Sequence, residues 1–347
     1  MRRRRAGRAH LQAYIARRIV LLPAMLVGIT LLAFVLSHAI PADPLAANLG
    51  ELAAADPVVV AAFRQQWGLD RGLHEQYLIY LWNLLQGNMG TSISTRQPVA
   101  LELRRRVPAT IELAVPALAV SVGLGVPLGI LAAVRRNTLV DQCARVLAIV
   151  GASTPLFWLG LIAIFVLYYR LGIVPAPGRL SATIPSPPFR TGFLLIDALA
   201  VGRLDAVADW ARHLVLPASV LSVYSLARVT RLMRGSMLEV LGEDYVRTAR
   251  AKGLRQSVVV LRHAARNALI PVITVIGLSF GDLLAGAVIT ETVFSWPGMG
   301  LYAFSSATSL DFPAILGAGI VVAAIYVLVN LLVDVAYAVV DPRIRVR

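Results

Sequence analysis

The sequence is poor in the residues that soluble domains and metal sites need. Only one of its 347 residues is cysteine, so a disulfide scaffold and a multi-cysteine metal site are both excluded. Charged residues make up 15%, against about 25% in soluble domains. Hydrophobic residues instead make up 58%, and the mean hydropathy is +0.72. A water-soluble globule cannot bury that much apolar side chain, so the composition predicts a protein embedded in lipid.

Lysine and histidine are also scarce, which bears on catalysis. The single lysine, Lys252, lies outside any Gly-Lys-Ser/Thr sequence, so the chain has no phosphate-binding P-loop. The five histidines lack the His-x-x-x-His spacing of a zinc protease. Residues 277–281 match the Gly-x-Ser-x-Gly pattern of a nucleophilic serine, but they lie in an apolar run, where close helix packing explains both glycines. We therefore predict no catalytic residue, metal ligand or cofactor site in this chain.

Six apolar stretches are long enough to cross the roughly 30 Å of hydrocarbon in a bilayer. Each is apolar around most of its circumference, which is typical of helices in lipid. The first exceeds the roughly 7–15 apolar residues of a signal peptide, so we interpret it as a retained helix. The sequence predicts an all-α integral membrane protein with six transmembrane helices. They would cover residues 19–40, then 108–134, 144–169, 214–233, 269–290 and 314–340, the last five forming a core over 108–340.

The arginines indicate which side of the membrane each loop faces. Basic residues are dense in residues 1–18, around the loop at 234–268 and in residues 341–347, but sparse in the long segments 41–107 and 170–213. The positive-inside rule then places the two tails and the 234–268 loop in the cytoplasm, and the two long segments outside. The net charge of +14 is explained by this topology and by contact with anionic membrane lipid, so we expect no nucleic acid partner.

The loop at 234–268 carries the most specific pattern. Residues 244–252 contain no helix breaker, begin with acids and end with bases, as a helix dipole favours. Gly253 followed by Leu254 is a typical helix stop, because glycine adopts the left-handed conformation and the next apolar residue packs back. A second short helix over 257–267 would lead to the fifth span. The pattern predicts a rigid knob of two helices.

This loop and several other segments resemble one family, the permease subunits of ATP-binding-cassette (ABC) importers. The matching segments are residues 40–44, 87–92, 106–113, 245–254, 262–271, 291–300 and 341–345. More narrowly, they resemble the first permease subunit of dipeptide and oligopeptide importers over nearly the whole chain. One departure is Arg247-Thr248-Ala249, where the generic coupling motif has Glu-Ala-Ala. The peptide branch commonly replaces this Glu.

The resemblance implies a type I ABC importer permease in the inner membrane of a bacterium or archaeon, and a set of partners. A second homologous permease subunit would complete the pathway, and an extracytoplasmic substrate-binding protein would deliver a peptide substrate. Two separate ABC ATPase subunits would bind ATP and Mg, while this chain would hold no cofactor. Nickel or glutathione remain alternative solutes. A proton-coupled secondary transporter, with Asp282 as a proton carrier, is the alternative from another class.

The resemblance also indicates which residues would dock on the ATPase as a coupling helix. They are Glu243, Asp244, Tyr245, Arg247, Ala249, Arg250, Ala251, Lys252 and Gly253. The small side chains of Ala249 and Ala251 would allow close approach to a partner. A solvated basic loop beside anionic lipid is the alternative interpretation.

Charges inside spans are costly and usually face a cavity. Asp282 lies about 20 Å from the cytoplasmic end of the fifth span, and we expect it, together with Ser279, on the translocation path, where it could meet a peptide amino group. A hydrogen-bonded aspartate between helices is the alternative. Arg228 lies about 8 Å from the inner end of the fourth span, so the depth difference of about 12 Å predicts that it does not pair with Asp282.

Overall fold

The computed structural model describes residues 23–32, 34–35, 57–67 and 71–340. Within these ranges the regular elements are helices, apart from an isolated antiparallel bridge between Thr91 and Pro98. The predicted tails lie outside the described residues, as do residues 19–22, 33 and 36–40 of the predicted first span, of which Pro23–Leu32 is an apolar helix.

Four helices among the described residues are long and apolar enough to cross a membrane. They coincide with the second, fourth, fifth and sixth predicted spans, and each begins before the apolar stretch does. They are α5 (Val99–Val134), α9 (Leu204–Leu241), the continuous helix Gln256–Val293 and α14 (Phe312–Val340).

The third apolar stretch is broken. Helix α6 (Leu139–Ser153) is followed by α7 (Leu156–Ala163) and its π-helical continuation η1 (Ile164–Arg170), and the two parts meet at 105°. The break lies at Pro155, whose ring disfavours helical geometry in the preceding residue. Thr154 is accordingly extended, with φ −80° and ψ 126°. Counted as one span, this bent pair brings the candidate spans in the described residues to five.

The short helix predicted over 257–267 is not a separate element. Three consecutive segments form one helix of 38 residues instead. They are α11 (Gln256–Val258), η2 (Val259–Ala264) and α12 (Ala265–Val293). Whatever moves this part of the 234–268 loop therefore also moves the fifth span.

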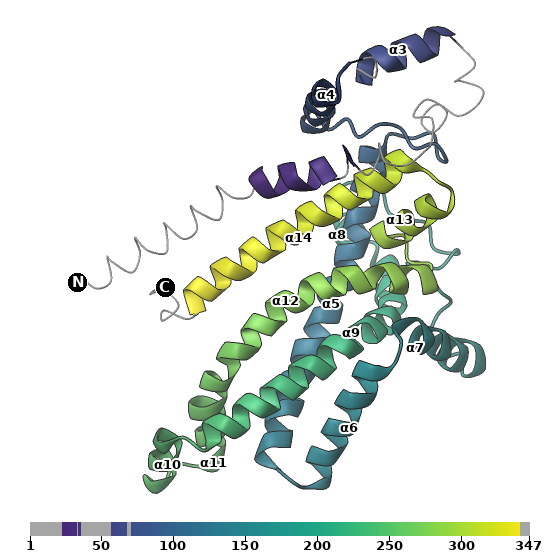
Figure 1. Ribbon diagram of the computed structural model, residues 1–347. Helices are drawn as coiled ribbons and strands as arrows, with labels where there is room; N and C mark the ends of the chain where they lie inside the picture. Colours follow the sequence, from purple (N-terminus) through teal and green to yellow (C-terminus); the bar gives the residue numbers. More distant parts are fainter. Residues whose placement is uncertain (1–22, 33, 36–56, 68–70, 341–347) are drawn as a thin grey trace.

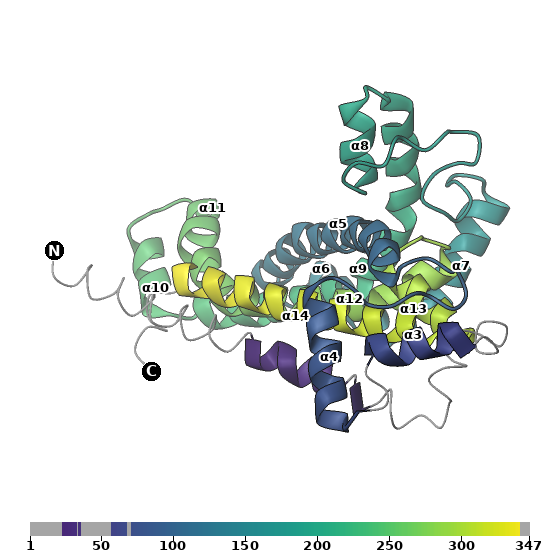
Figure 2. The same cartoon turned by 90° about the horizontal axis from the view of Figure 1, so that it is seen from above.

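The remaining helices are shorter and lie at the ends or to the side of the bundle. They are α3 (Pro57–Trp67), α4 (Leu73–Leu85), α8 (Leu194–Ala200), α10 (Asp244–Ala251) and α13 (Met299–Thr308). Figure 1 shows α10 and α11 at one end, and α3, α4 and α13 toward the other. Seen from above, α8 stands out to one side of the bundle (Figure 2). The loop predicted on the inside and the segment of α3 and α4 predicted on the outside thus lie at opposite ends.

Glycines allow the spanning helices to pack closely. A Cβ on Gly129 of α5 would lie 2.7 Å from the Cβ of Met233 on α9, closer than real side chains approach. On α12, a Cβ on Gly281 would overlap the ring of Tyr326 on α14. The prediction that helix packing explains the second glycine of the 277–281 pattern is therefore confirmed.

Candidate coupling helix, intramembrane ion pair and outer polar cluster

Helix α10 begins at Asp244 and ends at Ala251, close to the predicted bounds. The residue Gly253 has φ +74°, in the left-handed region. Two backbone bonds close the end: the N–H of Leu254 donates to the carbonyl of Ala249 (3.4 Å), and that of Gly253 donates to the carbonyl of Arg250 (2.9 Å). This pair of bonds is a Schellman motif, so the predicted helix stop is confirmed.

Contacts on its inner face fix α10 to two spanning helices. Val246 and Ala249, three residues apart on one face, are buried together with Val259 of η2. Val240 and Leu241, at the end of α9, pack against the same cluster. In addition, Asn267 on α12 donates a hydrogen bond of 2.7 Å from Nδ2 to the hydroxyl of Tyr245. The helix is therefore mounted on both α9 and the continuous helix 256–293.

The nine predicted docking residues do not all point the same way. Ala249 is only 6% exposed, so its small side chain serves close packing inside the chain rather than approach to a partner. That part of the prediction was wrong, because α10 uses its Val246–Ala249 face for its own attachment. The other eight are exposed: Glu243, Asp244, Tyr245, Arg247, Arg250, Ala251, Lys252 and Gly253.

The exposed surface of α10 is positively charged toward its C-terminal end. Arg247 lies 3.4 Å from Asp244, but both side chains are more than three-quarters exposed, and such surface pairs contribute little. Arg250 and Lys252 follow and are exposed as well. In the residues that the structure describes, no three His, Cys, Asp or Glu side chains gather into a metal site.

Arg228 and Asp282 form an ion pair in the spanning region. The Nη1 atom of Arg228 on α9 donates to Oδ2 of Asp282 on α12 across 2.6 Å. The prediction that they would not pair was wrong, because it ended the fourth span at Met233. Helix α9 continues to Leu241 and the helix of the fifth span begins at Gln256, so the hydropathy ends of the two spans do not mark a common depth from which the two side chains can be compared.

A cavity of about 180 Å³ adjoins this ion pair. It lies at the break between α6 and α7, against α9 and α12. Its lining includes Thr154 at the break, Tyr224 and Ser225 on α9, and Asp282 and Gly286 on α12. Because Asp282 lines it, the cavity has a carboxylate within an otherwise largely apolar wall.

The structure does not bring Ser279 to this cavity, although the sequence pattern placed it on the path with Asp282. Its side chain is fully buried, and its hydroxyl donates a hydrogen bond of 2.7 Å to the carbonyl of Val275 in the same helix. The Asp282 side chain, in contrast, is 49% exposed. Only the aspartate is therefore available to a solute.

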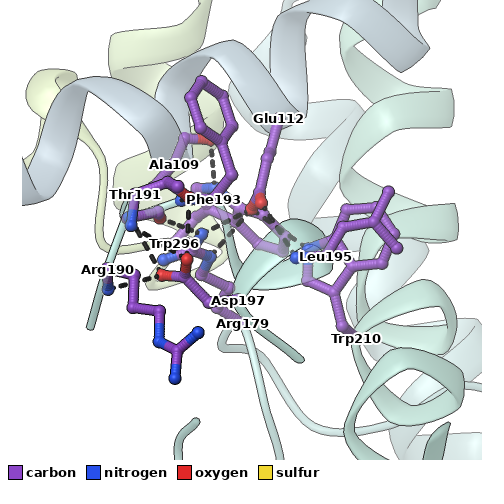
Figure 3. Close-up of polar contacts among 11 residues, drawn as sticks. Ala109, Glu112, Arg179, Arg190, Thr191, Phe193, Leu195, Asp197, Trp210 and Trp296 are labelled. Atoms are coloured by element: carbon purple, nitrogen blue, oxygen red, sulfur yellow. Dashed lines mark hydrogen bonds and ion pairs between the residues drawn. The ribbon is translucent and has the colours of Figure 1, made fainter. Parts of the chain in front are cut away.

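Near the end of the bundle that was predicted to face outward, buried carboxylates hold the segment 170–213 in place (Figure 3). Glu112 of α5 accepts hydrogen bonds from Nη2 of Arg179 (2.6 Å) and from the indole N–H of Trp210 (3.1 Å). The backbone N–H of Leu195 also donates to it, at 3.3 Å. Sequence reasoning noted no role for Arg179, since its partner Glu112 is 67 residues away.

Asp197 of α8 organises the loop that precedes it. Its carboxylate accepts hydrogen bonds from the backbone N–H groups of Arg190, Thr191 and Gly192, and from the Thr191 hydroxyl. Burial raises the pKa of Asp197, but these bonds outweigh burial and hold the pKa below its ordinary value of 3.8. The loop thus depends on a charged carboxylate.

Glu291, near the C-terminal end of α12, organises the segment 291–300. Its carboxylate accepts hydrogen bonds from the backbone N–H groups of Gly300 (2.6 Å) and Leu301 (3.0 Å), in the first turn of α13. A Cβ on Gly298 would overlap that carboxylate, so only glycine fits there. The indole N–H of Trp296 donates to the carbonyl of Ala109 on α5, at 2.8 Å (Figure 3). This segment anchors α13.

Comparison with known proteins agrees with this architecture. Residues 125–346 match the family described as binding-protein-dependent transport system inner membrane component, and residues 11–114 match the N-terminal component of such systems. The chain is 49% identical to a probable D,D-dipeptide transport system permease protein of Escherichia coli, over 91% of this chain and 93% of that one. It is 44% identical to a dipeptide transport system permease protein of E. coli, over 96% and 98%.

Two further proteins extend the comparison. A di/tripeptide transport system permease protein of Pseudomonas aeruginosa is 45% identical, over 96% of this chain and 98% of its own. The crystal structure of an amino acid ABC transporter with histidines is 16% identical and has a TM-score of 0.47, covering 70% of this chain and 94% of its own. The family matches and the curated relatives extend over most of the sequence. The chain therefore belongs to the family of binding-protein-dependent transport system inner membrane components.

Proposed function

We propose that this chain is one permease subunit of an ABC importer for dipeptides and short oligopeptides. It would form half of the pathway, with a second homologous permease subunit forming the other half. The names of the relatives support the substrate class, since three of them are dipeptide or di/tripeptide permeases. An extracytoplasmic binding protein would deliver the peptide.

In this proposal the chain crosses the membrane six times, with both termini in the cytoplasm and a type I permease arrangement. It catalyses no reaction and holds no cofactor. Two separate ATPase subunits bind ATP and Mg and dock on the exposed face of α10. The family match favours this assignment over a proton-coupled transporter.

The observation that carries the proposal is the attachment of α10. Its inner face packs on both α9 and the helix 256–293, and its outer face presents the eight exposed docking residues. Closure of the ATPases would move α10, and the two spanning helices would follow as rigid bodies. Such a movement converts the bundle between inward-open and outward-open states.

Asp282 supports the placement of the pathway. A charged side chain in a span rarely faces lipid, because burying it there costs several kcal/mol. The exposed side of Arg228 and Asp282 would therefore face the pathway or the second permease subunit. In the pathway, Asp282 would meet the amino group of an incoming peptide.

The coupling role is tested by Gly253→Val in the complete importer, reconstituted in vesicles with its binding protein. A β-branched residue disfavours the left-handed conformation of Gly253, so the Schellman end should open. We expect ATP hydrolysis to continue while peptide uptake falls. Gly202→Val is the matched control, because Gly202 has φ +72° and open space around it, near the outer end. Unchanged uptake in Gly253→Val would refute the role.

The substrate class is tested with the same wild-type vesicles. Radiolabelled dialanine, glutathione and Ni²⁺ are offered separately, with and without ATP. Uptake of dialanine that requires both ATP and the binding protein supports the proposal. Uptake of only Ni²⁺ or only glutathione would assign the importer to that solute instead.

A further inference from the structure

We infer that Arg228 and Asp282 are a binding site for the two charged ends of one peptide. The Asp282 carboxylate would take the α-amino group and the Arg228 guanidinium the α-carboxylate. This inference rests on the proposed function and adds to it a recognition step within the membrane, after the peptide has left the binding protein.

The geometry of the pair is that of a site that can open. The two side chains come from different spanning helices, α9 and α12, and meet through a short hydrogen bond of 2.6 Å. They are not sealed in the core: Arg228 is 38% and Asp282 49% exposed. Arg228 can therefore move away from Asp282 without unpacking either helix.

Space for a small solute lies next to the pair. The cavity of about 180 Å³ is lined by Asp282, and by Tyr224 and Ser225 one turn of α9 before Arg228. Drug-sized ligands occupy pockets of about 300–1,000 Å³, so this cavity suits a smaller molecule. The ends of an extended dipeptide are about 7 Å apart, so such a peptide would reach both charges once they separate.

The charges also explain why a zwitterion is favoured. When no solute is present, Arg228 and Asp282 neutralise each other, and neither is left unpaired in the spanning region. A solute with a single charged end would pair with one of the two residues and leave the other charge without a partner, which is costly in a membrane span. A solute with a free amino group and a free carboxylate satisfies both. The pair therefore selects peptides with two free ends.

The test measures equilibrium binding to the importer complex in lipid nanodiscs, without the binding protein, so that only the permease can discriminate. The probes are four forms of radiolabelled dialanine: unmodified, N-acetylated, C-amidated and blocked at both ends. For the wild type we expect unmodified dialanine to bind at least about tenfold more tightly than either half-blocked form, because hydrogen bonds between charged groups are strong.

Two variants show which of the two residues binds which end of the peptide. Asp282→Asn should remove the preference for a free amino group and retain the preference for a free carboxylate. Arg228→Gln should do the reverse. Loss of a purely structural ion pair would instead weaken binding of all four peptides alike. Arg203→Gln and Asp205→Asn are the matched controls, since these residues form a similar pair at the outer start of α9, 2.6 Å apart.

The outcomes separate the two proposals. If the wild-type complex binds all four forms equally, binds none, or if both variants affect all forms equally, the inference is wrong. In any of these cases, ATP-dependent uptake of dialanine with the binding protein still supports the proposed function. If that uptake is also absent, the proposed function itself fails.

Discussion

The hydroxyl of Thr110 on α5 donates a hydrogen bond of 2.6 Å to the carboxylate of Glu291 on α12. The same hydroxyl oxygen accepts one of 2.8 Å from the backbone N–H of Met299. Three helices, α5, α12 and α13, thus meet at one fully buried carboxylate. The start of α13 is held by these bonds and not by a side-chain cap of its own.

Removal of the Glu291 carboxylate should loosen the contact between α5, α12 and α13. In Glu291→Ala the two N–H groups at the start of α13 lose their acceptor, at about 1–3 kcal/mol each. Glu291→Gln keeps one oxygen acceptor and should lose less. We expect a lower thermal unfolding midpoint of the purified importer complex in that order. Glu75→Ala, in an exposed position on α4, is the control. An unfolding midpoint of Glu291→Ala equal to that of the wild type would contradict this account.

The loop ahead of α8 should respond to acid. The pKa of Asp197 is below 3.8, because its hydrogen bonds to three backbone N–H groups and a hydroxyl outweigh its burial. A lowered pKa means that the stabilisation is fully present above 3.8 and is lost as the pH falls through the folded-state value. We therefore expect limited proteolysis at residues 185–193 to accelerate below about pH 4 in the wild type.

The matching variant removes the charge. Asp197→Asn should be cleaved faster at neutral pH, because an amide nitrogen cannot accept the bonds that one carboxylate oxygen accepts. It should also lose the acid response. Asp205→Asn, in an exposed ion pair, should change neither. If the wild-type loop resists protease equally at pH 7 and pH 3, Asp197 does not hold it through its charge.

The contact between α12 and α14 should be intolerant of added volume. Gly281→Ala places a methyl group in the ring of Tyr326 and should cost about 1–3 kcal/mol by overpacking. Tyr326→Ala should restore part of this loss in the double variant. Gly319→Ala, where a Cβ meets nothing within 4 Å, is the control. The measurement is a double-mutant cycle on thermal stability, and strict additivity would show that the two residues do not touch.

Substitutions of the two alanines of α10 should distinguish the attachment of this helix to the spanning helices from its docking on the ATPase subunits. Ala249→Leu enlarges a buried side chain and should reduce hydrogen-exchange protection of α10. Ala251→Leu enlarges an exposed one and should leave protection unchanged, but weaken co-purification of the ATPase subunits. If Ala251→Leu retains the ATPases as the wild type does, Ala251 lies outside the docking surface.

The sequence predicted α10 well because the signals for a short helix are local. Acids at its start, bases at its end and Gly253 beyond it all lie within ten residues, and the structure shows the expected Schellman end. The burial of Ala249 was not predictable in the same way, because it depends on Val259, which approaches through tertiary packing.

The ion pair was missed for a different physical reason. A hydropathy pattern ends a span where polar residues begin, but the helical backbone can continue beyond that point. Helix α9 continues past Arg231 and Arg234 to Leu241, and the helix of Asp282 begins at Gln256, so neither predicted span end gives the depth of its charged residue. The Nε and Nη2 atoms of Arg234 are stabilised there by the buried carboxylate of Asp141. The spacing of residues within α9 cannot reveal a partner that lies on a different helix.

The attachment of α10 has a consequence for the ion pair itself. The two helices on which α10 is mounted, α9 and the helix 256–293, are the ones that carry Arg228 and Asp282. A force applied to the surface of α10 is thus transmitted to both residues of this ion pair. Arg228 lies about 20 Å along α9 from the end of the helix at Leu241. A movement of α10 would therefore displace Arg228 and Asp282 together.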